Sequence, residues 1–576
     1  MRMYIRTLVA SILFTLPINS QELPKNPDSA LVRIPADTTI LIHVHGLELV
    51  KEKLKQVLVP TKVMTEKEVD DLFGEMLDGR KIQSLRKDGR IVLAINSLFQ
   101  PLEKMEFTLF LPCASIDKLK RELLTSEELK LSGKDNDLDK IQFEIFSLFA
   151  VEIPDYVVLS THAETAKSCR DRPVVQLPEI VAGNIYSQII ENDISVCFAT
   201  KQINQLYQAE IKPIRDAVAT LLAGGLKDLQ IRGVSSGQLE LSRTLFGEAI
   251  RLSNTCSALV ASIKFEKDAL QLSITGNLPA NSPAPKTIAH GPREVLQLLE
   301  SQPKLFELNS VTSYRTIGYE SASASLGALQ MRSSNDQTNE VFRKLFSKLN
   351  QAQIAPAVNA GNLLNPHSIK VYQFSDANDA LGILEHLFSA TDSNTWISGY
   401  RLKGPATKAE KKVPLAEKDF THWTLPLNLD AMVTAEEATD PTSRKQELLQ
   451  ALAGKEFMEL YYRVEGKKLV LVVAPDVATA AKWVQQLDLG KATLANDPMF
   501  QLIAGKLPSD SQILATFESA AVQKWVSNAK LPTPQGYLGL AVRETPGQFQ
   551  IICRFHPTLL PYVQQLMKLP ETPLKK

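Results

Sequence analysis

Two short runs, Tyr156-Val157-Val158-Leu159-Ser160 and Ala163-Glu164-Thr165-Ala166-Lys167, encode a strand that leads directly into a helix. Aromatic and β-branched residues favour the extended backbone of a strand, whereas Ala, Glu and Lys favour a helix. The same pattern returns as Leu469-Val470-Leu471-Val472-Val473, followed by Ala478-Thr479-Ala480-Ala481-Lys482. We therefore predict a strand and helix unit in each half of the chain.

Three further pairs of segments recur in the same order along the two halves. They are Phe107–Leu111 with Ile369–Phe374, Asp193–Phe198 with Asp510–Phe517, and the hairpin Ala258–Ile274 with Tyr537–Ile552. The members of each pair are separated by roughly 260 to 320 residues, so insertions are needed to align them. Four matches in one order indicate an internal duplication.

The predicted strands occur both next to helices and in adjacent hairpins, and some alternate apolar with polar residues, as Thr39–Val44 does in part. This mixture favours antiparallel sheets covered on one face over a doubly wound parallel fold. We predict an α+β fold of two related domains, each a mostly antiparallel curved sheet packed with helices. Their expected bounds are 30–278 and 292–576, and the proline-bearing segment 279–291 is the expected linker.

The N-terminus has the composition of a cleavable secretory signal over residues 1–20. Arg2 and Arg6 supply positive charge, and Thr7–Ile18 supplies an apolar run too short to span a bilayer comfortably. Cleavage is expected near Ser20 or Gln21. No later segment is long and apolar enough for a membrane span after cleavage, so we predict a periplasmic or secreted protein.

Charge and cysteine content narrow the classes of partner and scaffold. Lys plus Arg and Asp plus Glu each number 64, so the chain has no overall positive field and nucleic acid is disfavoured as a partner. The five cysteines are an odd number, widely spaced and without a C-x-x-C motif. A disulfide scaffold is therefore not indicated, although one bridge stays open.

The mature sequence opens on Ile34-Pro35-Ala36-Asp37-Thr38-Thr39-Ile40-Leu41-Ile42, and a similar phrase returns as Leu507-Pro508-Ser509-Asp510-Ser511-Gln512-Ile513-Leu514-Ala515. Proline and Asp or Thr together form a rigid turn that starts a strand. With the Leu494–Phe500 stretch, these residues resemble a group of large exported bacterial proteins of unknown function with repeated domains. The resemblance implies an extracytoplasmic location and a repeated α+β build, and it implies no catalytic residue.

His43 and His45 are the candidate metal ligands, because residues two apart on a strand lie on the same face. A metal site needs a third ligand, which the neighbouring sequence does not supply. The later copy of the opening phrase has Thr516 and Glu518 at the matching positions. An exposed strand face explains both histidines equally well, so no metal and no cofactor are predicted.

Gly233-Val234-Ser235-Ser236-Gly237 matches the G-x-S-x-G pattern of a hydrolase nucleophile elbow. The preceding Asp228–Arg232 is far more polar than the buried central strand of that fold, which favours a plain loop. No Gly-rich nucleotide loop and no H-E-x-x-H motif occur. The sequence therefore predicts a protein that is not an enzyme.

We expect a binding or structural interaction module of the periplasm or cell envelope, whose partner is an envelope protein, a polymer or an apolar ligand. A first alternative is a carrier that lodges an apolar ligand between sheet and helices, since 44% of the residues are hydrophobic. A second alternative is a hydrolase or metal-dependent enzyme.

The predicted signal can be tested on protein expressed from the complete reading frame in a bacterial host. We expect the recovered extracytoplasmic protein to begin near Gln21, as read by mass spectrometry of its N-terminal peptide. A variant with Leu8→Arg and Leu13→Arg in the apolar run should keep Met1 and stay in the cytosol. An intact N-terminus on cytosolic unmodified protein contradicts the prediction.

Overall fold

The computed structural model describes residues 28–562 apart from 77–81, 99, 101–104, 136, 144–146, 172–176, 211, 214–254, 280–285, 288–293, 303–307, 313, 316–330, 334–335, 355–356, 362–366, 398–399, 433–444, 447, 451, 490–492, 523–532 and 546. The expected signal, residues 1–20, and the candidate nucleophile Ser235 lie outside the described residues.

The chain divides into two compact units, each described here by itself. The first comprises Met1–Val218, Ala249–Pro283 and Thr545–Lys576, and the second comprises Ala219–Glu248 and Ala284–Glu544. By this division the chain passes between the units after Val218, Glu248, Pro283 and Glu544, and Pro283 lies inside the expected linker. Both units combine helices with an antiparallel sheet, which agrees with the α+β class predicted from the sequence.

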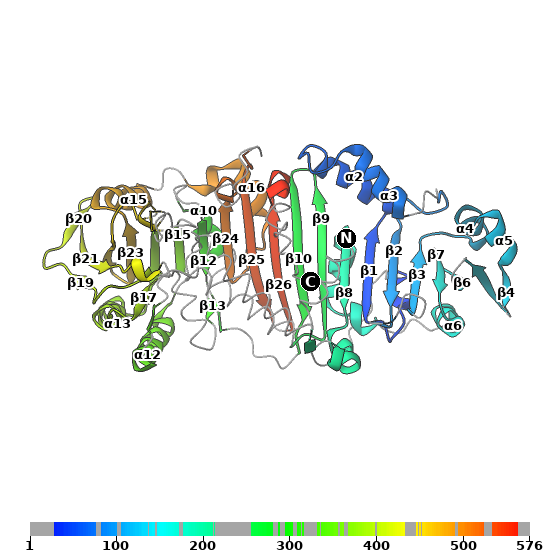
Figure 1. Cartoon of the computed structure of the whole chain (residues 1–576), viewed down its shortest axis with the longest axis horizontal. Helices are drawn as coiled ribbons and strands as arrows, with labels where there is room; N and C mark the ends of the chain where they lie inside the picture. The colour runs from blue at the N-terminus through cyan, green and yellow to red at the C-terminus, as the bar shows by residue number, and fades with distance from the viewer. Residues whose placement is uncertain are drawn as a thin grey trace. The chain divides into compact units, whose positions relative to one another are not determined.

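The first unit is built on eleven antiparallel strands. In spatial order they are β26 (Gln548–Phe555), β10 (Ala269–Asn277), β9 (Ala258–Glu266), β8 (Ile194–Phe198), β1 (Ile40–His45), β2 (Arg90–Ile95), β3 (Phe107–Leu111), β7 (Tyr156–Ser160), β6 (Ser147–Ile153), β5 (Leu138–Gln142) and β4 (Gly133–Asp135). Figure 1 shows these strands side by side in this order.

Helices cover both faces of the first sheet. The helical segments are η1 (Leu31–Arg33), α2 (Leu47–Leu58), α3 (Glu66–Met76), α4 (Ile116–Leu123), α5 (Ser126–Leu131), α6 (Ala163–Asp171), η3 (Glu179–Val181), α7 (Asn184–Glu191) and η8 (Pro557–Leu559). One face packs with η1, α6, η3 and α7 in a single apolar cluster. The opposite face packs with α4 over β3, β7, β6 and β5.

The second unit contains a comparable sheet. Its order is β25 (Tyr537–Thr545), β24 (Ile513–Glu518), β12 (Leu308–Thr312), β15 (Ala357–Gly361), β16 (Ser368–Gln373), β23 (Lys468–Ala474), β22 (Phe457–Glu465) and β21 (Lys418–Pro426), with β19 (Thr407–Lys408) and β20 (Val413–Leu415) both on the far side of β21. Smaller pairings join β11 (Lys286–Thr287) to β13 (Tyr314–Arg315), and β17 (Thr395–Ile397) to β14 (Met331–Ser333) and β18 (Tyr400–Arg401).

The second sheet is also covered on two faces. Its helical segments are α10 (Glu294–Glu300), α12 (Asp336–Ala352), α13 (Ala377–Ser389), η4 (Asp430–Met432), α15 (Val477–Leu489), η5 (Leu494–Asn496), α16 (Pro498–Ile503), η6 (Ala504–Lys506) and α17 (Ser519–Val522). Helices α12 and α13 pack on one face and α15 on the other. The Asp376 side chain caps α13 by accepting hydrogen bonds from the amides of Asn378 and Asp379.

Eight strands of each unit follow the same path. In the first unit these strands lie in the spatial order β9-β8-β1-β2-β3-β7-β6-β5, and in the second unit the order is β25-β24-β12-β15-β16-β23-β22-β21. The chain visits the equivalent positions of the two sheets in the same succession. The four segment pairs noticed in the sequence fall on β3 and β16, β7 and β23, β8 and β24, and β9 and β25. The strands and helices expected for β3, β7, β16 and β23 are confirmed.

The sequence also led to expectations about disulfide bonds and membrane-spanning helices. All five cysteines are free thiols, and Cys113, Cys169, Cys197 and Cys256 are buried, as small apolar side chains commonly are. Within the described parts of the chain, no helix combines the length and hydrophobicity needed to cross a bilayer.

Strand β10 carries a glycine that its packing requires. A Cβ at Gly276 would overlap the Phe549 ring and the Cys256 Sγ. Both neighbours belong to one buried cluster.

We expect Gly276→Ala to lower the free energy of unfolding by about 1–3 kcal/mol in urea denaturation. Gly133→Ala, in β4 with open space around the new methyl group, should change it by less than about 0.5 kcal/mol; equal effects at the two sites contradict this account.

Candidate functional site

The two candidate histidines lie on β1, as expected, but in different environments. The ring centroids of His43 and His45 are 6.4 Å apart. His43 is fully buried, whereas His45 is half-buried. The interpretation that both stand on an exposed strand face is therefore wrong for His43, because η1, α6 and α7 cover that face of the sheet.

Strand pairing also corrects the matching positions in the second unit. Strand β24 takes the place of β8, and β12 takes the place of β1. Because His43 pairs with Val92 and Ser195, its counterpart is Val311, which pairs with Val358 and Leu514. Thr516 and Glu518 are therefore not the counterparts of His43 and His45.

His43 begins a buried polar row that crosses four strands of the first sheet. Ser195 of β8, Ser262 of β9 and Ser273 of β10 stand successively opposite one another. All four residues of the row are almost completely excluded from solvent. The hydroxyls of Ser273 and Ser262 are 3.4 Å apart, at the long end of hydrogen bonding.

The polar row lacks the properties of a catalytic or metal centre. Neither ring nitrogen of His43 nor the Ser195 hydroxyl has a hydrogen-bond partner in the described part of the chain. Burial, with smaller contributions from Arg90 and His45, lowers the pKa of His43 to about 3. The described residues contain no group of three His, Cys, Asp or Glu side chains positioned to share a metal ion. His43 and Ser195 are both fully buried in the described structure.

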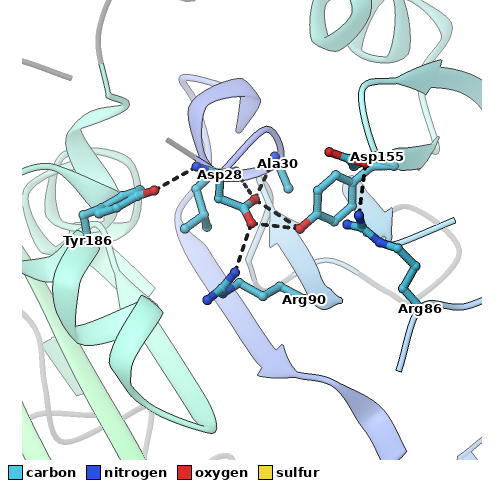
Figure 2. A network of polar contacts seen from close by, with 8 residues as sticks. Asp28, Ala30, Arg86, Arg90, Asp155 and Tyr186 are labelled. Atoms are coloured by element: carbon cyan, nitrogen blue, oxygen red, sulfur yellow. Dashed lines mark hydrogen bonds and ion pairs between the residues drawn. The ribbon is translucent and has the colours of Figure 1, made fainter. Parts of the chain in front are cut away.

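A second polar cluster fixes the start of the described chain (Figure 2). The Asp28 amide donates to the Tyr186 hydroxyl at 2.8 Å. The Asp28 carboxylate accepts from the Tyr156 hydroxyl at 2.9 Å and from the Ala30 amide at 2.9 Å. Arg90 stands 3.5 Å from the same carboxylate. These contacts tie the segment before β1 to β7, α7 and β2.

The Asp28 cluster is a structural anchor. Burial, reinforced by the neighbouring Asp28 carboxylate, raises the pKa of Tyr156 well above its usual range, so this hydroxyl keeps its proton and donates it in a hydrogen bond. The residues that follow Asp28, including Leu31, Val32 and Ile34, are buried in the apolar cluster beneath α6 and α7. The anchored segment therefore fills one face of the first sheet.

The second unit holds a partly open cavity of about 260 Å³ between its sheet and α15. Val358, Val371 and Val470 form its floor, because they pair directly across β15, β16 and β23. Val484 and Leu487 of α15 form the opposite wall. The remaining lining residues are Ser301, Gln302, Lys418, Phe420, Glu465 and Lys468.

The rim of this cavity is polar and mainly cationic. Lys418 and Glu465 form an ion pair of 3.3 Å, and each retains about a third of its side-chain exposure. Lys468 stands directly opposite Glu465 in the β22–β23 hairpin. Gln302 is buried in the wall, where its amide donates to the Ser310 carbonyl at 3.4 Å. An apolar floor below a charged rim suits a small amphipathic ligand.

One larger side chain, Phe110, occupies the corresponding row of the first unit. Val158, Phe110 and Val92 form the equivalent row across β7, β3 and β2. Phe110 thus stands where the second unit has Val371. All three residues belong to the filled cluster that also contains Leu31 and Ile34. The first unit is therefore packed at the place where the second is hollow.

The cavity residues carry no recognisable signal in the sequence. Lys418 and Lys468 lie in ordinary strand-end sequence, and nothing in their spacing marks a site. The replacement of Phe110 by Val371 is visible in the sequence, but its meaning depends on the register of both sheets. Comparisons with protein-family models, with curated proteins and with solved structures found no match for this chain.

The buried, unpaired imidazole of His43 makes the first unit sensitive to acid. The unfolded chain binds a proton near pH 6.5 and the folded chain only near pH 3, so stability falls as the pH is lowered between these values. We expect His43→Leu to remove a slope approaching about 1.4 kcal/mol per pH unit, measured by urea unfolding at pH 7, 6, 5 and 4.

The control for this prediction is His162→Gln, since the side chain of His162 is more than half exposed beside Glu106. It should retain the slope of the unmodified protein. A pH dependence that His43→Leu leaves unchanged would show that other groups cause the acid sensitivity.

Proposed function

We propose that this chain is an exported, non-enzymatic binding protein of the periplasm or cell envelope, and that the cavity of its second unit holds a small ligand with an apolar body. The cavity is the observation that carries the proposal. Its floor of three valines and its helical wall give the ligand an apolar surface, and its partial opening gives access. This combines the predicted binding module with the carrier that the sequence left as an alternative.

The chemistry of the lining favours binding over catalysis. The lining has one hydroxyl, that of Ser301, and neither histidine nor cysteine. Its one carboxylate, Glu465, is engaged by Lys418 and also by Arg463. A nucleophile with an adjacent base is the usual requirement for covalent catalysis, and these residues do not form one.

A duplication of one ancestral domain accounts for the two units and belongs to the same proposal. Support comes from the eight strands that share spatial order and chain connections. Their register agrees as well, because Val158, Phe110 and Val92 align with Val470, Val371 and Val358 through successive pairings. In this account one copy keeps a filled core and the other has acquired the cavity.

The proposal predicts that filling the cavity abolishes binding. Val371→Phe places in the second unit the aromatic ring that Phe110 supplies in the first. We expect the mature protein to bind octanoate or 1-octanol in isothermal titration calorimetry, and Val371→Phe to lose at least about tenfold in affinity. Leu487→Phe fills the same space from α15, so it provides a second test of the proposal in case Val371→Phe does not fold.

The matched control is Val341→Phe, an equal change at an exposed position of α12 in the same unit. Circular dichroism and thermal unfolding should show all three variants folded. The proposal fails if the unmodified protein binds neither compound, or if both filled variants bind as the unmodified protein does.

A further inference from the structure

We infer that the ligand of the second unit's cavity is a small amphipathic carboxylate, whose anionic group binds the Lys468 ammonium and whose aliphatic chain lies on Val470, Val371 and Val358. This inference rests on the proposed function and names the chemistry of the ligand. It follows from the charges of the rim, from the residues that fill the corresponding place in the first unit, and from the size of the cavity.

The charges of the rim favour an anion. Glu465 is the single carboxylate in the lining, and it already pairs with Lys418 and Arg463. Lys468 has no ion-pair or hydrogen-bond partner among the described residues, and its side chain belongs to the cavity lining. A carboxylate at Lys468 gains a charge-assisted hydrogen bond, and Lys418 adds a second positive charge nearby.

The first unit shows how a carboxylate is held at the equivalent position. Tyr156 follows a two-residue turn and pairs with Ile153, just as Lys468 follows a two-residue turn and pairs with Glu465. Each residue stands two positions before the valine of the shared row, Val158 or Val470, and so lies on the same face of its strand. The Asp28 carboxylate accepts the Tyr156 hydroxyl hydrogen bond, and buried apolar residues follow it along the chain.

The anchored segment of the first unit is therefore a covalently attached equivalent of the inferred ligand. It presents a carboxylate at the start of β7 and an apolar body over the row that contains Val158 and Val92. In the second unit Val371 replaces Phe110 in this row, and the donor at the strand start is an ammonium instead of a phenol. An ammonium compensates the charge of a free carboxylate, which a phenol does not.

The cavity volume restricts the aliphatic part to a short chain. About 260 Å³ lies just below the range of roughly 300–1,000 Å³ typical of pockets for drug-sized ligands. A medium-chain carboxylate with its head at the rim fits this size better than a long-chain fatty acid or a lipid with two chains. Each methylene removed from water contributes about 0.8 kcal/mol, so affinity should rise with chain length until the cavity is full.

The test compares octanoate with 1-octanol, which share an eight-carbon chain and differ in the charged group. Calorimetric titrations use the mature protein at low ionic strength and pH 7. We expect octanoate to bind about tenfold more tightly than 1-octanol. Lys468→Gln should weaken octanoate binding about three- to tenfold and leave 1-octanol within twofold, because only the charged head contacts Lys468.

Lys467→Gln is the matched control, since Lys467 is the adjacent turn residue and does not line the cavity. It should bind octanoate as the unmodified protein does. Raising the salt concentration should weaken octanoate and not 1-octanol. Equal affinity for the two compounds, or equal effects of the two lysine changes, overturns the carboxylate assignment and leaves the proposed function standing. Binding of neither compound overturns the proposed function itself.

Discussion

Antiparallel pairing sets one residue of each strand in a continuous row across the sheet, and the filled core of the first unit and the cavity of the second differ along one such row. In the first unit the row contains Phe110, Val92 and His43. In the second, the corresponding residues are Val371, Val358 and Val311. Since directly paired residues share a face, one change alters the packing of the whole covering layer.

The two units also depart from close, fully hydrogen-bonded packing at different places along this row. The first unit fills the region near β7 with Phe110 and the anchored segment after Asp28, and places unpaired polar groups at His43 and Ser195. The second unit has Val311 and Leu514 at the latter positions, but it buries the Lys370 ammonium without a partner among the described residues and also holds the cavity beside β23. Buried polar groups without partners are destabilising, and both units contain titratable ones: burial lowers the pKa of His43 to about 3 in the first unit and that of Lys370 to about 7 in the second.

Local structure was accessible from the sequence, whereas register was not. The runs around Val158 and Val470 identify strands because apolar β-branched residues cluster between turns, and the following alanines identify helices. The pairing of β8 with β1 joins segments about 150 residues apart, and no local pattern specifies such a contact. The i, i+2 spacing of His43 and His45 predicts a shared face, but whether that face is covered depends on α6 and α7. The opening phrase at Ile34 precedes β1, but the similar phrase at Leu507 precedes β24, which holds the position of β8 and not that of β1.

The cavity is also significant energetically. A closed, dry void of about 260 Å³ would cost about 6 kcal/mol at roughly 24 cal/mol per Å³, which is an upper limit for this partly open cavity. Partial opening lets water enter and reduces this cost, yet water on three valines gains little in hydrogen bonds. Valine to phenylalanine at position 371 would narrow this cavity, whereas in the first unit the segment after Asp28 fills the same region together with Phe110. Among the described residues the exposed Lys468 ammonium at the rim has no partner, and the proposed carboxylate would supply the missing apolar contacts and a negative charge together.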